Sequence, residues 1–121
     1  MGCGYKDLIV WQKAMSMAKE VYSLVKCLPS EERYALSDQI RRAAVSVPSN
    51  IAEGYARKST KAYLSFLGIA SGSCAELETQ LILCVELGYL DKERTDKVFK
   101  LNSEVGKMIT SIIKKLSDPK S

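Results

Sequence analysis

The chain has 121 residues, of which 46% are hydrophobic and 26% are charged, and its formal net charge is +4. This composition is that of an ordinary globular protein and excludes a disordered or collagen-like chain. No apolar run reaches the roughly 18 residues that a membrane-spanning helix needs, and the first residues lack the apolar segment of a signal peptide. We therefore expect one cytoplasmic domain over residues 1–121, with no membrane segment.

The residue types that carry most enzymatic chemistry are scarce. The sequence has no histidine, and its four cysteines, Cys3, Cys27, Cys74 and Cys84, form no C-x-x-C pair. Histidine is the commonest general base, and a zinc site needs clustered histidine or cysteine ligands. We expect reduced cysteines that pack as small core residues, no metal, no cofactor and no catalytic site.

Apolar residues recur every three or four positions in the first half of the chain, which is the periodicity of a helix. The first predicted helix covers about residues 8–28 and ends before Pro29. The second covers about residues 33–53, with Gly54 as its C-terminal cap. Pro48 falls inside this second helix, where it removes a backbone donor, so we expect the helix to continue with a kink near Pro48.

The second half of the chain repeats this periodicity. The third predicted helix covers about residues 59–87, and the fourth covers about residues 92–116. Three short connections join the four helices, and short connections make neighbouring helices antiparallel. The sequence therefore predicts an all-α, antiparallel up-down-up-down four-helix bundle.

The third predicted helix carries apolar residues away from its main stripe. Residues 59–90 contain one basic and three acidic residues, so this helix is poor in charge. A helix that is apolar on more than one side is usually buried on more than one side. Either these extra positions tolerate apolar residues at the surface, or they form a subunit interface made of Leu64, Ile69, Ile82 and Leu83.

Polar residues recur at helical spacing on the second and third predicted helices. Three interpretations are open for them: a solvated face, a functional pocket, or a buried polar network that fixes how the helices pack. Two carboxylates alone, without a nucleophile or a metal, do not define a catalytic pair. The candidate network consists of Gln39, Ser46, Asn50, Glu53, Ser73 and Glu76.

Basic residues cluster at two places on the second helix and its connection. These candidates for contacts with RNA or DNA phosphates are Arg41, Arg42, Arg57, Lys58 and Lys61, with further lysines scattered along the fourth helix. The charge permits nucleic-acid binding but does not require it, and the alternative is an ordinary solvated basic surface.

Several segments together resemble one known family. They are DLIVWQKA at 7–14, QIRRAA at 39–44, SVPSNIAEG at 46–54, ELETQL at 76–81 and LGYL at 87–90. They resemble the bacterial four helix bundle protein family, also called the 23S rRNA intervening-sequence protein family. Some members of this family are encoded within insertions in large-subunit ribosomal RNA genes. The resemblance runs from about residue 5 to about residue 116.

The resemblance implies a homopentamer of four-helix bundles arranged as a barrel. It also implies kinship with accessory proteins of diversity-generating retroelements, which are similar pentamers that bind a reverse transcriptase and nucleic acid. It supplies no catalytic residues. Two hypotheses follow: a homo-oligomer that binds RNA or DNA through a basic surface, or a scaffold that docks a partner protein such as a reverse transcriptase.

Overall fold

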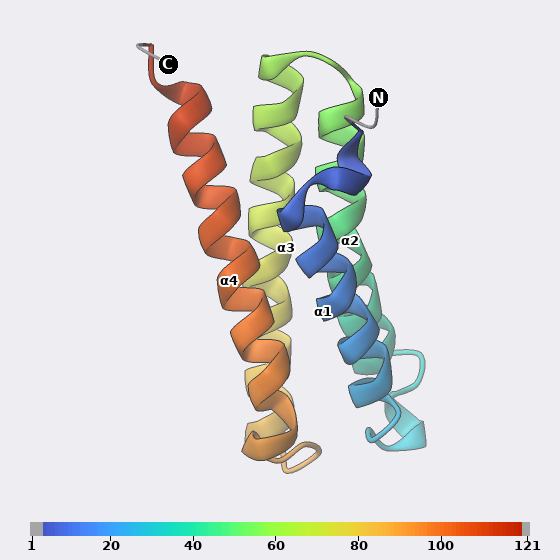
Figure 1. Cartoon of the computed structure of the whole chain (residues 1–121). Helices are drawn as coiled ribbons and strands as arrows, with labels where there is room; N and C mark the ends of the chain where they lie inside the picture. Colours follow the sequence, from blue (N-terminus) through green and yellow to red (C-terminus); the bar gives the residue numbers. More distant parts are fainter. Residues whose placement is uncertain (1–3, 120–121) are drawn as a thin grey trace.

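Four long helices make up the fold. The structure, a computed structural model, describes residues 4–119. The helices are α1 (Ile9–Val25), α2 (Leu36–Ala56), α3 (Thr60–Glu86) and α4 (Lys92–Ser117), with short 3-10 turns η1 (Tyr5–Asp7) and η2 (Ser30–Glu32). Residues 4–119 contain no strand. Successive helices run in opposite directions (Figure 1), which confirms the predicted all-α four-helix bundle.

The helices form a closed square, because each packs against its two neighbours and α1 also packs against α4. Each helix contributes a stripe of apolar side chains at three- and four-residue spacing, and these stripes meet at the centre. Leu77 and Leu81 of α3 are fully buried there. The largest fully buried side chains are Met17, Ile40, Ile51, Leu67, Leu77, Leu81 and Ile109.

Helix α2 differs from the prediction at both ends. It continues through Pro48 as expected, but it begins at Leu36 because residues 30–32 form η2. It ends at Ala56, so Gly54 is not its C-terminal cap. Lys58 instead takes the left-handed conformation of the following turn, with a φ of 58°. Gly54 is needed for packing, because a Cβ atom there would lie 2.6 Å from Cβ of Phe66 on α3.

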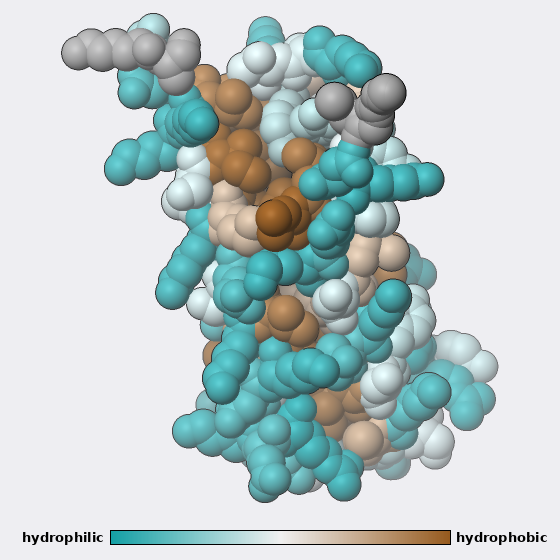
Figure 2. All heavy atoms as spheres, viewed as in Figure 1, coloured by the Kyte–Doolittle hydropathy of each residue, from teal (hydrophilic) through white to brown (hydrophobic). Residues whose placement is uncertain are grey.

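Helix α1 is the shortest of the four and ends at Val25, three residues before the predicted end. At the top of the bundle in Figure 1, the end of α2, the start of α3 and the end of α4 all extend beyond the first turn of α1. Apolar surface is therefore visible over the start of α1 and the C-terminal half of α4 (Figure 2). Ile9 and Leu116 are exposed apolar residues of these two segments.

Candidate functional site

A chain of hydrogen bonds crosses the seam between α2 and α3. The hydroxyl groups of Ser46 and Ser73 lie 2.8 Å apart, and Asn50 donates its amide to the hydroxyl oxygen of Ser46 at 2.9 Å. Ser73 is buried, while Ser46 and Asn50 are half-buried. The structure thus brings together three of the six residues of the candidate polar network.

The other three residues of that candidate network lie apart from these contacts. Glu53 forms an ion pair with Arg57 at 2.8 Å on the surface of α2. Gln39 and Glu76 are exposed beside a small hollow between α2 and α3. The seam therefore holds two helices together, and its described groups include neither a nucleophile with a base nor a metal-binding set.

The predicted phosphate contacts do not form one patch. Arg42 pairs with Asp38, Arg57 pairs with Glu53, and Arg41 donates to the backbone carbonyl of Arg33 at 3.4 Å. Lys58 follows the end of α2 and Lys61 lies in the first turn of α3, both at one end of the bundle. Arg41 and Arg42 precede Ala56, the last residue of α2, by 15 and 14 residues, so they lie roughly 20 Å farther along the helix. Arg41 is half-buried and the other four cations are exposed, and two of the five already face carboxylates.

A more regular basic surface lies on α4, whose lysines look scattered in the sequence. Lys97 pairs with Glu20 of α1, and Arg94 pairs with Asp91. Lys100, Lys107 and Lys114 recur every seven residues, so they share one side of the helix at about 10 Å intervals. Among residues 4–119, none of these three lysines has a carboxylate within ion-pair distance. We call them the α4 lysine row.

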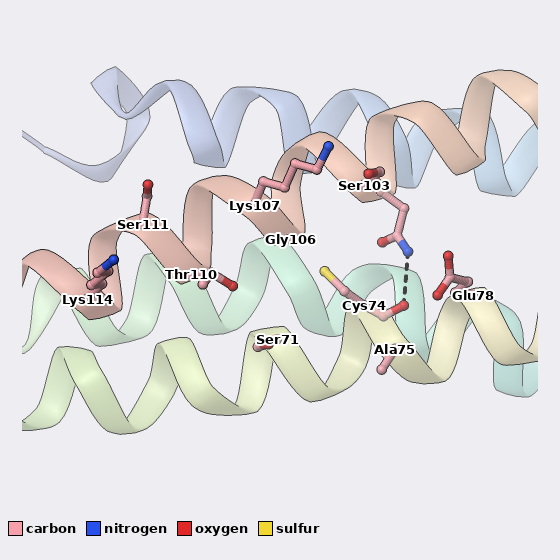
Figure 3. A pocket seen from close by; sticks show the side chains of 11 residues that line it. Ser71, Cys74, Ala75, Glu78, Ser103, Gly106, Lys107, Thr110, Ser111 and Lys114 are labelled. Atoms are coloured by element: carbon pink, nitrogen blue, oxygen red, sulfur yellow. Dashed lines mark hydrogen bonds between the residues drawn. The ribbon is translucent and has the colours of Figure 1, made fainter.

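Two members of the α4 lysine row, Lys107 and Lys114, border a groove between α3 and α4 of about 580 Å³ (Figure 3). The groove is lined by Lys107 and Lys114 and by small residues such as Ser71, Ala75 and Gly106. Figure 3 shows the thiol of Cys74 and the hydroxyl of Thr110 between the two helices, with Lys107 extending away from α3.

Asn102 forms part of this groove and is almost completely buried. Its amide donates to the backbone carbonyl of Cys74 at 2.9 Å, while its own carbonyl oxygen has no partner within the described chain. Burial raises the pKa of the Cys74 thiol to about 11, and the Glu78 carboxylate adds to the rise. A thiol that stays protonated at neutral pH is a poor nucleophile, so the groove is better suited to binding than to covalent chemistry.

The four residues of the predicted subunit interface divide between two sides of α3. Leu64 and Ile82 are 18 residues apart, a whole number of turns, and lie on the side nearer α4. Ile69 and Leu83 lie on the side nearer α2. Ile69, Ile82 and Leu83 are each between 44% and 51% exposed. Small residues at Gly68, Gly72 and Ala75 lie between these two sides.

A second apolar surface, not foreseen from the sequence, lies between α1 and α2. It is a groove of about 540 Å³ lined mainly by apolar and aromatic residues. Six of them are Trp11, Met15, Tyr22, Val45, Pro48 and Ala52, and Lys19 stands among them. Tyr22 and Val45 are 46% and 41% exposed, which is unusual for side chains of this kind grouped together.

At the end of the bundle opposite the first and last described residues, one carboxylate accepts hydrogen bonds from two parts of the chain. Glu32 of η2 accepts a hydrogen bond from the Tyr89 hydroxyl at 3.0 Å and another from the backbone N–H of Leu36 at 3.4 Å. The hydrogen bond to Glu32 raises the pKa of Tyr89, since ionising the phenol would remove the donor. This contact joins the α1–α2 and α3–α4 connections.

The chain is thus a small four-helix bundle with two open grooves, one between α3 and α4 and one between α1 and α2. The family model for 23S rRNA-intervening sequence proteins matches residues 6–111. The chain therefore belongs to this family. None of the helices in residues 4–119 is long and apolar enough to cross a membrane, and no group of three metal-ligating side chains occurs there.

One solved structure with the same fold is a protein of unknown function from the S23 ribosomal protein family of Bacteroides thetaiotaomicron. It is 29% identical to this chain, with a TM-score of 0.81, and the match covers 88% of this chain and 99% of the other. No curated protein matches the chain with significance.

Proposed function

We propose that the chain is a non-enzymatic homo-oligomer, a homopentamer as the family resemblance implies, that binds RNA or DNA in the cytoplasm. The α4 lysine row is the observation that carries the proposal. Three lysines at a regular spacing lie on one exposed side of a helix and have no ion pair within residues 4–119, an arrangement that suits a polyanion with repeating charges.

The mode of binding is contact with backbone phosphates and little reading of sequence. Base stacking needs exposed aromatic platforms, and no aromatic residue lines the groove beside the lysine row. Each copy in an oligomer adds its own +4 to the total charge, so weak contacts on single chains are multiplied.

The test is the salt dependence of binding to a labelled single-stranded RNA, followed by fluorescence anisotropy. Each phosphate contact contributes about −0.7 to the slope of log K against log salt, so Lys107→Gln with Lys114→Gln should flatten the slope by about 1.4. Lys97→Gln is the matched control, because Lys97 lies on the same helix but pairs with Glu20. Equal changes in the two variants would contradict the proposal.

A protein-interaction scaffold that docks a partner such as a reverse transcriptase is the second candidate function. The observation that favours it is the apolar surface over the start of α1 and the C-terminal half of α4, where Ile9 and Leu116 are exposed (Figure 2), since burial of apolar surface drives most protein association. Absence of RNA binding at about 50 mM salt by an intact oligomer would favour this scaffold over the phosphate-binding function.

A further inference from the structure

Two uncovered apolar surfaces lie on different parts of the same chain. One is the α1–α2 groove, with Trp11, Tyr22 and Val45 among its lining residues. The other is the outer side of α3, where Ile69, Ile82 and Leu83 are exposed. We call the second surface the α3 outer face. Neither surface is covered by any described part of the chain, because each lies on the outside of the square of helices.

The shapes of the two surfaces are complementary, because one is a groove and the other is the outer side of a helix. The groove is a concave depression of about 540 Å³. The α3 outer face has Ile82 at its edge nearer α4 and Leu83 at its edge nearer α2, with small residues at Gly72 and Ala75 about two to three turns before them. A helix of this kind can lie closely along a groove, with the larger side chains inserted into it.

Their charges are complementary as well. Between residues 62 and 91 the chain has no lysine or arginine, and Glu76 and Glu86 are exposed on α3. The groove instead has Lys19 among its lining residues. Within residues 4–119, Lys19, Glu76 and Glu86 have no ion-pair partner.

We propose that the α1–α2 groove of one copy receives the α3 outer face of a second copy of this chain. The proposal deepens, and rests on, the self-association that is part of the proposed function. Pairing groove with face buries both apolar surfaces and brings Lys19 of one copy toward the acidic side of α3 of the next. Pairing two α3 faces would set carboxylates against carboxylates with no intervening cation, which disfavours a symmetric contact.

The contact is therefore heterologous, and each copy keeps one free groove and one free face until a ring closes. This property gives a direct test with two variants. Val45→Lys disables the groove, and Leu83→Lys disables the face. Both positions are more than 40% exposed, so the bundle itself should tolerate them. Each variant alone should sediment as a monomer of 13.4 kDa, while the wild type forms a larger species.

A 1:1 mixture of the two variants should form a species of twice the monomer mass and nothing larger. The intact face of the Val45→Lys chain can enter the intact groove of the Leu83→Lys chain, and no other pairing remains. Trp11, the only tryptophan, reports the groove directly, so its emission should shift to shorter wavelength in the mixture and in the wild type. Tyr34→Lys, at an 88% exposed position outside both surfaces, should keep the wild-type mass.

Three outcomes would overturn the inference: a monomeric wild type, a Val45→Lys variant that keeps the wild-type mass, or a mixture that remains monomeric. If a variant loses its helical circular dichroism signal, Tyr22→Lys replaces Val45→Lys in the groove and Ile82→Lys replaces Leu83→Lys on the face, at positions 46% and 45% exposed.

The RNA measurement is separate, because Lys107 and Lys114 belong to neither surface. Loss of RNA binding with the mixing result intact would reject the nucleic-acid function and leave this inference standing.

Discussion

The hydroxyl oxygens of Ser46 and Ser73 lie 2.8 Å apart across the seam between α2 and α3, where Ser73 is only 7% exposed. Ser46 also receives the amide of Asn50. A polar group left unpaired at a buried position costs more than the hydrogen bond itself contributes, because the group has lost its contact with water. The two serines therefore depend on each other.

Ser46→Ala should lower the free energy of unfolding by about 1–3 kcal/mol, because it leaves the hydroxyl of Ser73 without its partner. The double variant Ser46→Ala with Ser73→Ala should cost less than the sum of the two single changes. Urea denaturation of the four proteins gives the coupling energy. Strict additivity would mean that the two hydroxyls do not interact in solution.

Gly54→Ala should destabilise the bundle by about 1–3 kcal/mol, because the new Cβ would meet Cβ of Phe66 at 2.6 Å and α2 would have to move away from α3. Gly106→Ala is the matched control, since a Cβ there meets no atom within 4 Å. The control should be neutral or stabilising by up to about 1 kcal/mol, as expected for glycine replaced within a helix. Thermal denaturation of both variants checks the difference, and equal effects would argue against the close approach.

Leu77→Ala and Leu81→Ala should each cost about 2–5 kcal/mol, since both side chains are fully buried and each truncation leaves a cavity. Tyr34→Ala, at an 88% exposed position, should change stability by less than about 0.5 kcal/mol. Chemical denaturation measures all three. Small losses at both leucines would place the core on another face of α3.

Alkaline pH should weaken the fold through the buried thiols. Burial raises the pKa of both Cys74 and Cys84 from 9.0 to about 11. The unfolded chain therefore ionises first, and the stability that the neutral thiols contribute is present below pH 9 and is lost between pH 9 and about 11.

The measurement for this prediction is the free energy of unfolding as a function of pH under reducing conditions. A variant with Cys74→Ala and Cys84→Ala should show a smaller decline over the same interval. Alkylation at pH 8 offers a second readout, in which exposed Cys27 reacts faster than the two buried thiols. Cys3 lies outside the described residues and is replaced by serine in this experiment. Equal reactivity at all three remaining cysteines would contradict the assigned burial.

Sequence periodicity predicted the fold well because each helix has a long, regular apolar stripe, and α3 and α4 begin and end within one residue of their expected bounds. The periodicity of apolar residues did not predict where α2 ends. Gly54 has the local pattern of a cap, but its role is set by Phe66, which is twelve residues away and on another helix. Local sequence does not contain that contact.

The interaction surfaces were harder to predict for a similar reason. Whether a lysine is free depends on neighbours across the bundle, as Lys97 shows by pairing with Glu20 on α1 while Lys107 has no such partner among the described residues. The α1–α2 groove combines residues from two helices, so neither helix alone indicates it. The division of Leu64, Ile69, Ile82 and Leu83 between two sides of α3 follows from spacing alone and was within reach of the sequence.

The arrangement of the ends of the chain has a practical consequence for protein engineering. The first and last described residues and the α2–α3 connection lie at one end of the bundle, while the Tyr89–Glu32 hydrogen bond lies at the other (Figure 1). A fluorescent protein or an affinity tag fused at either terminus would extend from the same end of each subunit. The opposite end would remain unobstructed, so surface attachment through such a tag would present it to the solution.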